Sequence, residues 1–288
     1  MLEELELLLI ESLDAAVPCR VCGGMSLPKF SQLVLDRIEA HYYECLECQT
    51  LQVINPDWLN QVYVQDDAGI SDLDLELVQR CLQLRHLILN CFQAGLFPGR
   101  RALDYGAGSA LLVRLLRDIG LDAYGYEPYV NPLHARSFMV SDLAPPPYDL
   151  ITMIEVVEHL VNPQEVLTQV SELLSPGGTI LISTSRYDPE RHDHTWAYLC
   201  PAIGQHITFY TDTAFKYLAD KLGLSLRFLN GGLCLLTSRS SSEQYQSYLQ
   251  QAVQTYTEQC QILDQMGLGY DYSYAGADEE QVRQNLFS

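Results

Sequence analysis

The chain has 288 residues and a formal net charge of −20, from 17 Lys and Arg against 37 Asp and Glu. This length suits one large domain with small appendages, and the scarcity of cations argues against nucleic acid as a partner. No stretch of about 18 uncharged apolar residues is present, so we expect no membrane span. The acidic N-terminal segment lacks the cationic flank of a signal peptide, which predicts a cytoplasmic protein.

Two Cys-x-x-Cys pairs stand near the N-terminus, as CRVC and CLEC. They supply Cys19, Cys22, Cys45 and Cys48, with 22 residues between the pairs. Four thiolates in this arrangement are the ligand set of a closed tetrahedral Zn²⁺ site. A redox-active pair is the alternative, but a double pair favours a structural zinc in a small ribbon.

The segments that follow alternate between helical and strand patterns. Apolar residues recur at the helical period over residues 71–92. Residues 100–120 then predict a short strand that leads through Gly106 and Gly108 into a helix that Gly120 can end, and a second strand ends at Glu127.

Further strands and helices are predicted after Glu127. Strands are expected over residues 137–142, 148–154 and 179–185, with a helix over 163–174 and a turn at SPGG. A helix over 213–222 and a hairpin over 224–238 complete the series. Alternating buried strands and helices predict an α/β fold with a doubly wound, mostly parallel sheet.

Ligands in such sheets bind beyond the carboxyl ends of the strands. Gly106 and Gly108 fall at one such end, where a backbone without Cβ atoms can approach a ligand closely. Glu127 falls at the next, where its carboxylate can accept hydrogen bonds from two ribose hydroxyls. A nicotinamide-binding oxidoreductase would have a third glycine at Leu111, so this departure counts against that class.

Several motifs in order, LDYGAG, GYEP, VSDL, YDLITMIEVVEHLVNP and LSPGGTILISTS, resemble class I S-adenosylmethionine-dependent methyltransferases. With the cysteine pairs, the chain is similar to a branch that carries a zinc ribbon and includes sugar and other small-molecule methyltransferases. The resemblance implies a Rossmann-like fold with S-adenosylmethionine as cofactor, its ribose held at Glu127 and its adenine amino group at Asp142. The cofactor-binding residues implied are Asp104, Tyr105, Gly106, Ala107, Gly108, Glu127, Pro128, Asp142, Leu143 and Glu155.

Glu155, Glu158 and His159 lie within one helical turn, directly after the strand predicted for residues 148–154. The resemblance implies that the end of this strand faces the methyl group and its acceptor. One role is general base catalysis, with His159 oriented by a carboxylate. A second is a divalent metal site that includes His206, since E-x-x-E-H resembles the motif of ubiquinone-pathway O-methyltransferases and of small-RNA 2′-O-methyltransferases. A third is a structural cap on the following helix, and the three roles stay open.

The segment over residues 186–210 is long and rich in aromatic residues and histidines, which is typical of lids and binding surfaces. Trp196, Tyr198 and His206 are the candidates for an acceptor pocket, whereas His192 and His194 are expected to be solvated. The catalytic candidates are thus Glu158, His159 and His206.

The C-terminal region predicts a helix over residues 243–263 with a tyrosine-rich apolar stripe. The stripe packs on the domain, forms a homodimer contact or covers the acceptor site. We therefore expect three parts: an N-terminal segment with the ribbon over 1–66, a cofactor-binding domain over 67–240, and a helix with a tail over 241–288.

The functional prediction is methyl transfer to a small-molecule acceptor, at a hydroxyl of a sugar or related metabolite. A metal-dependent O-methyltransferase acting on another acceptor is one alternative. A non-catalytic module that holds the cofactor and uses its ribbon for protein contacts is another, and it predicts cofactor binding without turnover.

Overall fold

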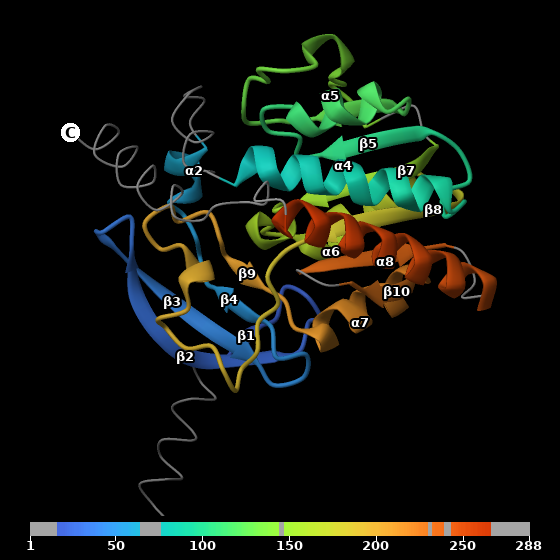
Figure 1. Ribbon diagram of the computed structural model, residues 1–288. Helices are drawn as coiled ribbons and strands as arrows, with labels where there is room; N and C mark the ends of the chain where they lie inside the picture. The colour runs from blue at the N-terminus through green and yellow to red at the C-terminus, as the bar shows by residue number, and fades with distance from the viewer. Residues whose placement is uncertain (1–15, 64–75, 144–146, 230–231, 239–242, 266–288) are drawn as a thin grey trace, which may run out of the picture. The chain divides into compact units, whose positions relative to one another are not determined.

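A computed structural model describes residues 16–63, 76–143, 147–229, 232–238 and 243–265 (Figure 1). The chain divides into two compact units. Unit 1 comprises Met1–Val64, Met153–Glu172 and Leu181–Leu236, and unit 2 comprises Gln65–Thr152, Leu173–Ile180 and Thr237–Ser288. No helix in the described part of the chain is long and apolar enough to cross a membrane.

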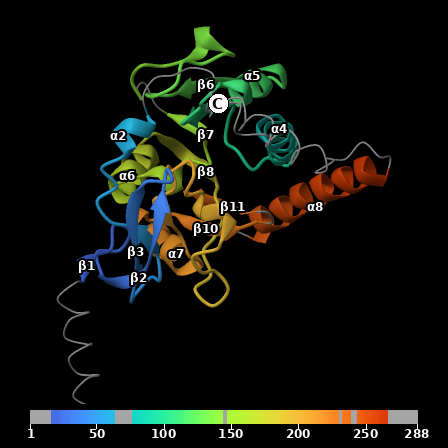
Figure 2. The same cartoon turned by 90° about the vertical axis from the view of Figure 1, so that its left-hand side faces the viewer.

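Unit 1 contains an antiparallel sheet built mainly from the N-terminal part of the chain (Figure 2). The sheet has the strand order β1-β2-β3-β4-β9. Its strands are β1 (Val17–Pro18), β2 (Met25–Val34), β3 (Ile38–Cys45), β4 (Leu51–Val53) and β9 (Thr208–Phe209). Tyr42, Leu51 and Phe209 lie in its buried core. The predicted ribbon therefore forms, and it gains a fifth strand from a segment about 150 residues further along the chain.

The rest of unit 1 is mainly helical. It contains α2 (Leu59–Val62), the short turn η2 (Val157–His159), α6 (Pro163–Glu172), η3 (Ala197–Leu199), α7 (Asp212–Leu222) and the strand β10 (Ser225–Phe228). Helix α7 begins where the Thr211 hydroxyl accepts a hydrogen bond from the Ala214 N–H, and it ends at Gly223 with φ 65°. These two caps explain the boundaries of that helix.

Unit 2 contains the first strand–turn–helix of the central sheet. Its elements are α4 (Leu77–Gln93), β5 (Arg101–Tyr105), α5 (Leu111–Asp118), β6 (Asp122–Tyr126), η1 (Arg136–Phe138) and α8 (Glu243–Gln265). Strand β5 pairs in parallel with β6 and with β7 (Tyr148–Ile154). The sheet has the order β10-β11-β8-β7-β5-β6, with β8 at Leu174–Ser183 and β11 at Leu233–Thr237. The predicted α/β fold class is confirmed.

The C-terminal helix packs along α4 within unit 2 (Figure 1). Tyr245, Leu249 and Ala252 of its stripe are buried, and the side chain of Asn90 in α4 donates a hydrogen bond to Gln259. This contact accounts for the stripe over that part of the helix.

Two local predictions are wrong. Residues 137–142 do not form a strand, because Arg136–Phe138 form a helical turn and only Met139 makes an isolated parallel bridge, to Gly125. Phe138 is held there by the Arg117 guanidinium over its ring. The SPGG segment does not form a separate turn but belongs to β8, which begins at Leu174, so the preceding helix ends at Glu172.

Candidate functional site

The glycine turn after β5 in unit 2 uses backbone conformations that side chains disfavour. Gly106 and Gly108 have φ of 74° and 51°. The Gly106 N–H donates to the Tyr126 carbonyl over 2.8 Å, which joins the end of β5 to the end of β6. A Cβ placed on Gly108 would meet no described atom within 4 Å. The space beside Gly108 suits a ligand that approaches the main chain of this turn.

Glu127 follows β6 and is fixed by backbone donors. Its Oε2 accepts a hydrogen bond from the Gly108 N–H at 2.9 Å, and its Oε1 accepts from Tyr129 and Val130 at 2.8 and 3.2 Å. The carboxylate therefore stands at the glycine turn, as its sequence position predicted. Its contact with a ribose stays a prediction.

Asp104 is buried at the carboxyl end of β5, with 4% of its surface exposed. Burial raises the pKa of this carboxyl to about 7, the hydrogen bond from the Thr152 hydroxyl opposes the rise, and the nearby Glu127 adds to it. The Thr152 hydroxyl donates to Asp104 Oδ1 over 2.6 Å. Because its pKa is near 7, the charge of the Asp104 carboxyl depends on the hydrogen bonds and charges beside it.

Ser109 is a residue of the same turn that the motif comparison missed. It is buried, and its hydroxyl has no hydrogen-bond partner among the described residues. A buried hydroxyl without a partner is costly unless a ligand or water supplies one. A small polar residue directly after the second glycine was the only signal in the sequence.

The remaining predicted cofactor residues of unit 2 surround these groups in the sequence. Tyr105 stacks near Tyr126, with ring centroids 5.2 Å apart. Asp142 is exposed and Leu143 half-buried, in the bend that follows the Met139 bridge. Ala107 and Pro128 lie in the turns that follow β5 and β6.

Glu155 belongs to unit 1 and follows β7 directly. Its φ of 52° lies in the left-handed region, which is rare for a residue with a long side chain. The Glu155 N–H donates to the Ser183 carbonyl over 3.0 Å. Its carboxylate accepts hydrogen bonds from the hydroxyls of Ser183 and Tyr198, the latter at 2.8 Å. These contacts hold an unfavourable backbone conformation in place.

Tyr198 joins the two glutamates of the motif. Its hydroxyl lies within hydrogen-bond distance of both Glu155 and Glu158, and its one proton serves one of them at a time. Burial and then Glu155 raise the pKa of Glu158 well above its ordinary value. Burial and then the two glutamates likewise raise the pKa of Tyr198, so the phenol stays a donor.

Two imidazoles face Glu158. His206 Nε2 lies 4.0 Å from Glu158 Oε1, and the His159 and His206 ring centroids are 5.1 Å apart. His206 Nδ1 lies 2.6 Å from the Tyr198 carbonyl. Because a carbonyl only accepts, Nδ1 carries the proton and Nε2 presents a lone pair. Burial and then His206 lower the pKa of His159 to about 3, so this imidazole is neutral.

Glu158, His159 and His206 together have the features of a metal-binding group. One ligand atom from each lies within 4.8 Å of the others. Glu158 Oε2 and His159 Nε2 are buried without a hydrogen-bond partner among the described residues. Glu155, the fourth residue predicted for this site, is outside the group, and both of its oxygens already accept hydrogen bonds. One carboxyl group and two imidazoles form a ligand set that fits a divalent transition metal.

Aromatic residues of the long segment continue from this cluster. Trp196 and Tyr198 have ring centroids 5.4 Å apart, and Tyr198 and His206 4.6 Å. His192 is half-buried and stacks on Trp196 at 4.1 Å, so the expectation that it is fully solvated is wrong, whereas His194 is exposed. Tyr187 is buried and donates to Glu44 of the ribbon, which gives it a structural contact.

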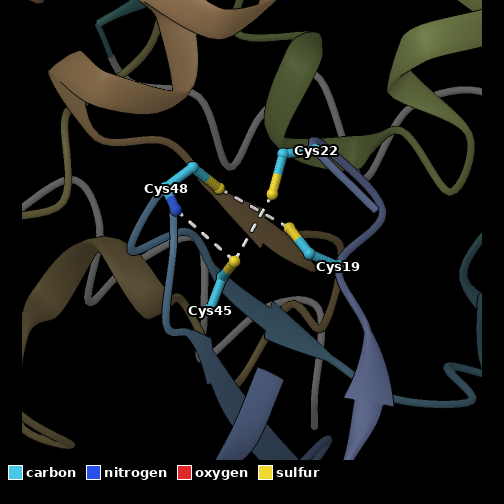
Figure 3. Close-up of side chains that lie close together, drawn as sticks. All are labelled: Cys19, Cys22, Cys45 and Cys48. Carbon is cyan, nitrogen blue, oxygen red and sulfur yellow. Dashed lines mark hydrogen bonds between the residues drawn. The ribbon is translucent and has the colours of Figure 1, made fainter. Parts of the chain in front are cut away.

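The four cysteines of the two pairs converge in unit 1 (Figure 3). Their sulfur atoms all lie within 4.8 Å of one another, with Cys19 and Cys48 at 3.6 Å and Cys22 and Cys45 at 3.4 Å. The hydrogen bond from Cys48 lowers the pKa of Cys19 to about 5. Three of the four are buried. Four thiols at one point, one of them acidic, fit a tetrahedral Zn²⁺ site.

The chain is similar to known proteins over a part that contains the glycine turn of unit 2 and the motif after β7. A family model described as a methyltransferase domain matches residues 77–227, more than half of the chain. The ubiquinone biosynthesis O-methyltransferase of Dechloromonas aromatica is 30% identical over 129 residues, which cover 39% of this chain and 53% of that protein. That of Aeromonas salmonicida is 28% identical over 167 residues, which cover 48% and 67%.

The chain thus spans about half to two thirds of these curated relatives. Among solved structures, human N-acetylserotonin methyltransferase in complex with SAM matches with 19% identity and a TM-score of 0.42, over 58% of this chain and 56% of that one. The match to the family model covers the glycine turn, Glu127 and the E-x-x-E-H motif. The chain belongs to the family of methyltransferase domains.

Proposed function

We propose that the protein transfers the methyl group of S-adenosylmethionine to a hydroxyl of a small molecule. The observation that carries this proposal is the group of Glu158, His159 and His206, in which Glu158 Oε2 and His159 Nε2 are buried without a partner among the described residues. Family membership supports the cofactor, and the curated relatives named for O-methylation support oxygen as the methylated atom.

In this proposal the glycine turn and Glu127 hold the cofactor. The absence of side chains at Gly106 and Gly108 lets the methionine end approach the backbone, and the Ser109 hydroxyl finds its partner there. Glu127 exchanges one of its backbone hydrogen bonds for the ribose hydroxyls. Asp104 then gains a donor from the ligand, which favours its charged form.

His206 is the better candidate for the base that takes the acceptor proton. The lowered pKa of His159 makes that imidazole a weak base. His206 instead has Nδ1 engaged with the Tyr198 carbonyl and Nε2 free to accept. The hydroxyl proton passes to His206 Nε2 as the acceptor oxygen bonds to the methyl carbon and the carbon–sulfur bond breaks, which leaves S-adenosylhomocysteine.

A divalent ion at the same residues is the alternative to His206 as base, because Nε2 of His206 cannot bind an ion and accept a proton at once. Glu158, His159 and His206 would hold it, because their ligand atoms converge and two of them have no other described partner. When bound, such an ion supplies a Lewis acid that binds acceptor oxygens and lowers the pKa of a hydroxyl. The Tyr198 hydroxyl, which contacts both Glu155 and Glu158, keeps the Glu158 carboxyl in place.

The cysteine site has a structural role in this proposal. All four positions of a tetrahedral zinc would be filled by cysteine, which leaves none for a substrate. Metal binding there stabilises the ribbon, whose own core is small.

A sugar or related metabolite is the first acceptor class to test, and an aromatic hydroxyl is the second. The resemblance to the branch with a zinc ribbon favours the former, and the curated relatives of ubiquinone biosynthesis favour the latter. Neighbouring hydroxyls in either class could reach one metal ion together. The net charge of −20 disfavours a polyanionic acceptor.

The decisive experiment combines binding and turnover. The protein is titrated calorimetrically with S-adenosylhomocysteine and separately with NAD, and we expect micromolar binding of the former alone, about −8 kcal/mol. Methyl-labelled S-adenosylmethionine is then supplied with a panel of sugars and a panel of dihydroxylated aromatics, with and without Mg²⁺ or Mn²⁺.

The matched variants are His206→Gln and His41→Gln, where His41 is an exposed histidine of the ribbon. We expect loss of labelled product in the first and full activity in the second. Cofactor binding without transfer to either panel would instead favour the non-catalytic module, and NAD binding would favour an oxidoreductase.

A further inference from the structure

Arg20 stands inside the first cysteine pair, between Cys19 and Cys22, yet its side chain points to a distant segment of unit 1. Its guanidinium donates to the Ile207 carbonyl at 3.2 Å and to the Thr208 hydroxyl at 3.0 Å, and it also donates to the Val53 carbonyl. All three acceptors are neutral, and the structure shows no ion pair of Arg20 with the residues it describes. A partly buried cation held by neutral acceptors acts through its fork-shaped geometry.

Both cysteine pairs hold the same segment, residues 206–211. At one end the first pair reaches Ile207 and Thr208 through Arg20. At the other end the Thr211 hydroxyl donates to the carbonyl of Cys48, in the second pair. The Val53 N–H donates to the Ile207 carbonyl at 2.9 Å, so the ribbon and this segment form one hydrogen-bonded layer.

The opposite side of this segment belongs to the glutamate–histidine cluster. The Ile207 N–H donates to the Glu158 carbonyl at 2.9 Å, and the Thr208 hydroxyl donates to the Leu160 carbonyl at 3.1 Å. Ile207 therefore binds Arg20 through its carbonyl and Glu158 through its N–H. His206 is the residue before it, and its Nε2 lies 4.0 Å from Glu158 Oε1.

The charges of the cysteine site and of the Arg20 guanidinium are opposite in sign when zinc is bound. Four thiolates around Zn²⁺ carry a net charge of about −2, and a cation beside them is stabilised. The Arg20 guanidinium is always protonated, so its charge is complementary to that of a zinc-loaded cysteine site.

We propose that Arg20 is a positioning residue that connects the cysteine site to the segment 206–211 and thereby sets the orientation of His206. The ribbon is then part of the support of the glutamate–histidine cluster. The catalytic significance of His206 rests on the proposed function, whereas its orientation can be measured without any turnover.

The test uses the full chain with ¹⁵N-labelled histidine and Co²⁺ in the cysteine site. Thiolate-to-cobalt absorption reports whether the ribbon is intact, and the ¹⁵N shifts of His206, identified with His206→Gln, report its tautomer. In the unaltered protein we expect Nδ1 protonated and Nε2 unprotonated. In Arg20→Met we expect the cobalt absorption to persist and the His206 signals to shift toward a mixture of tautomers.

Activity and conservative replacement supply independent readouts. Arg20→Met is expected to lower kcat by about tenfold or more, as is typical when a supporting contact of a site is removed, with S-adenosylhomocysteine affinity unchanged. Arg20→Lys keeps the charge but not the fork, so we expect partial recovery of the His206 signals. Arg37→Met, at an exposed arginine that donates to Gln61, is the matched control and is expected to change neither.

Thr208→Val provides a second break of the same connection. It replaces the hydroxyl that accepts from Arg20 by a methyl group of similar size. If Arg20→Met loses its cobalt absorption, this variant tests the inference in its place. Unchanged His206 signals with an intact ribbon, in Arg20→Met or, failing that, in Thr208→Val, would overturn the inference. Failure of the proposed function is distinct, since it would show as absent methyl transfer by the unaltered protein.

Discussion

The glycine turn of unit 2 and the glutamate–histidine cluster of unit 1 are built in opposite ways. The turn is local: Gly106, Gly108 and Glu127 lie within 22 consecutive residues, and backbone N–H groups make most of its contacts. The cluster is non-local, because Glu158 and His206 come from segments 48 residues apart and meet through side chains.

The difference indicates where each site is vulnerable. A backbone turn survives most side-chain changes and depends on a few glycines and one carboxylate. A buried cluster of carboxyls and imidazoles depends on every neighbour that supplies a hydrogen bond or excludes water. We therefore expect the cluster to depend on the ribbon and on Tyr198, and the turn to depend mainly on its own backbone contacts.

The largest expected effect should disturb the glutamate–histidine cluster and leave the glycine turn intact. Cys45→Ser removes one of the four proposed zinc ligands, and metal binding in such sites contributes about 10 kcal/mol or more to folding. We expect loss of bound zinc, rapid proteolysis within residues 16–53, and disturbed His206 signals, while S-adenosylhomocysteine still binds. Cys200→Ser, at a half-buried cysteine outside the site, is the control. Loss of cofactor binding in Cys45→Ser would contradict the independence of the turn.

The second effect concerns pH and the turn. The pKa of Asp104 is raised from 3.8 to about 7 in the folded state, so its contribution to stability is complete below about pH 4 and is lost as the pH rises to 7. A rise of about three in this pKa corresponds to a loss of at most about 4 kcal/mol in unfolding free energy. Asp104→Asn should therefore flatten the fall in unfolding free energy between about pH 4 and 8, measured by urea denaturation. Asp118→Asn, at a more exposed position, should leave that fall unchanged.

The third effect tests the carboxylate of the turn. Glu127→Ala removes the acceptor predicted for the ribose, and a hydrogen bond to a charged group contributes about 1 to 3 kcal/mol. We expect S-adenosylhomocysteine affinity to fall roughly 10- to 100-fold in a calorimetric titration. The exposed Glu172→Ala serves as the reference. Equal affinities in the two variants would remove Glu127 from the cofactor site.

The smallest effect tests the cluster. Tyr198→Phe deletes the hydroxyl that hydrogen-bonds with Glu155 and Glu158, at a cost of about 1 kcal/mol in unfolding free energy. Because the ring remains, cofactor affinity should not change. Thermal unfolding beside Tyr217→Phe measures the difference, and identical stability of the two variants would show that the bridge contributes nothing.

Several features were accessible from local patterns. The four cysteines, the glycine turn and Glu127 were identified because short spacings and strand ends place such residues by chain geometry alone. The strand predicted for residues 137–142 was wrong for a related reason. Its apolar residues suit a strand, but contacts of Phe138 with Arg117 and of Met139 with Gly125 hold a different conformation.

The sequence by itself determined the α/β class, the two cysteine pairs, the glycine turn and the position of the E-x-x-E-H motif after a buried strand. The tertiary structure decided which partners those residues have. It brought His206 to Glu158, placed the Tyr198 hydroxyl between two glutamates, and directed Arg20 from the ribbon to Ile207. Turns and strand ends follow from neighbours in the chain, whereas buried polar contacts between distant segments arise only when the core closes and each group must find a partner.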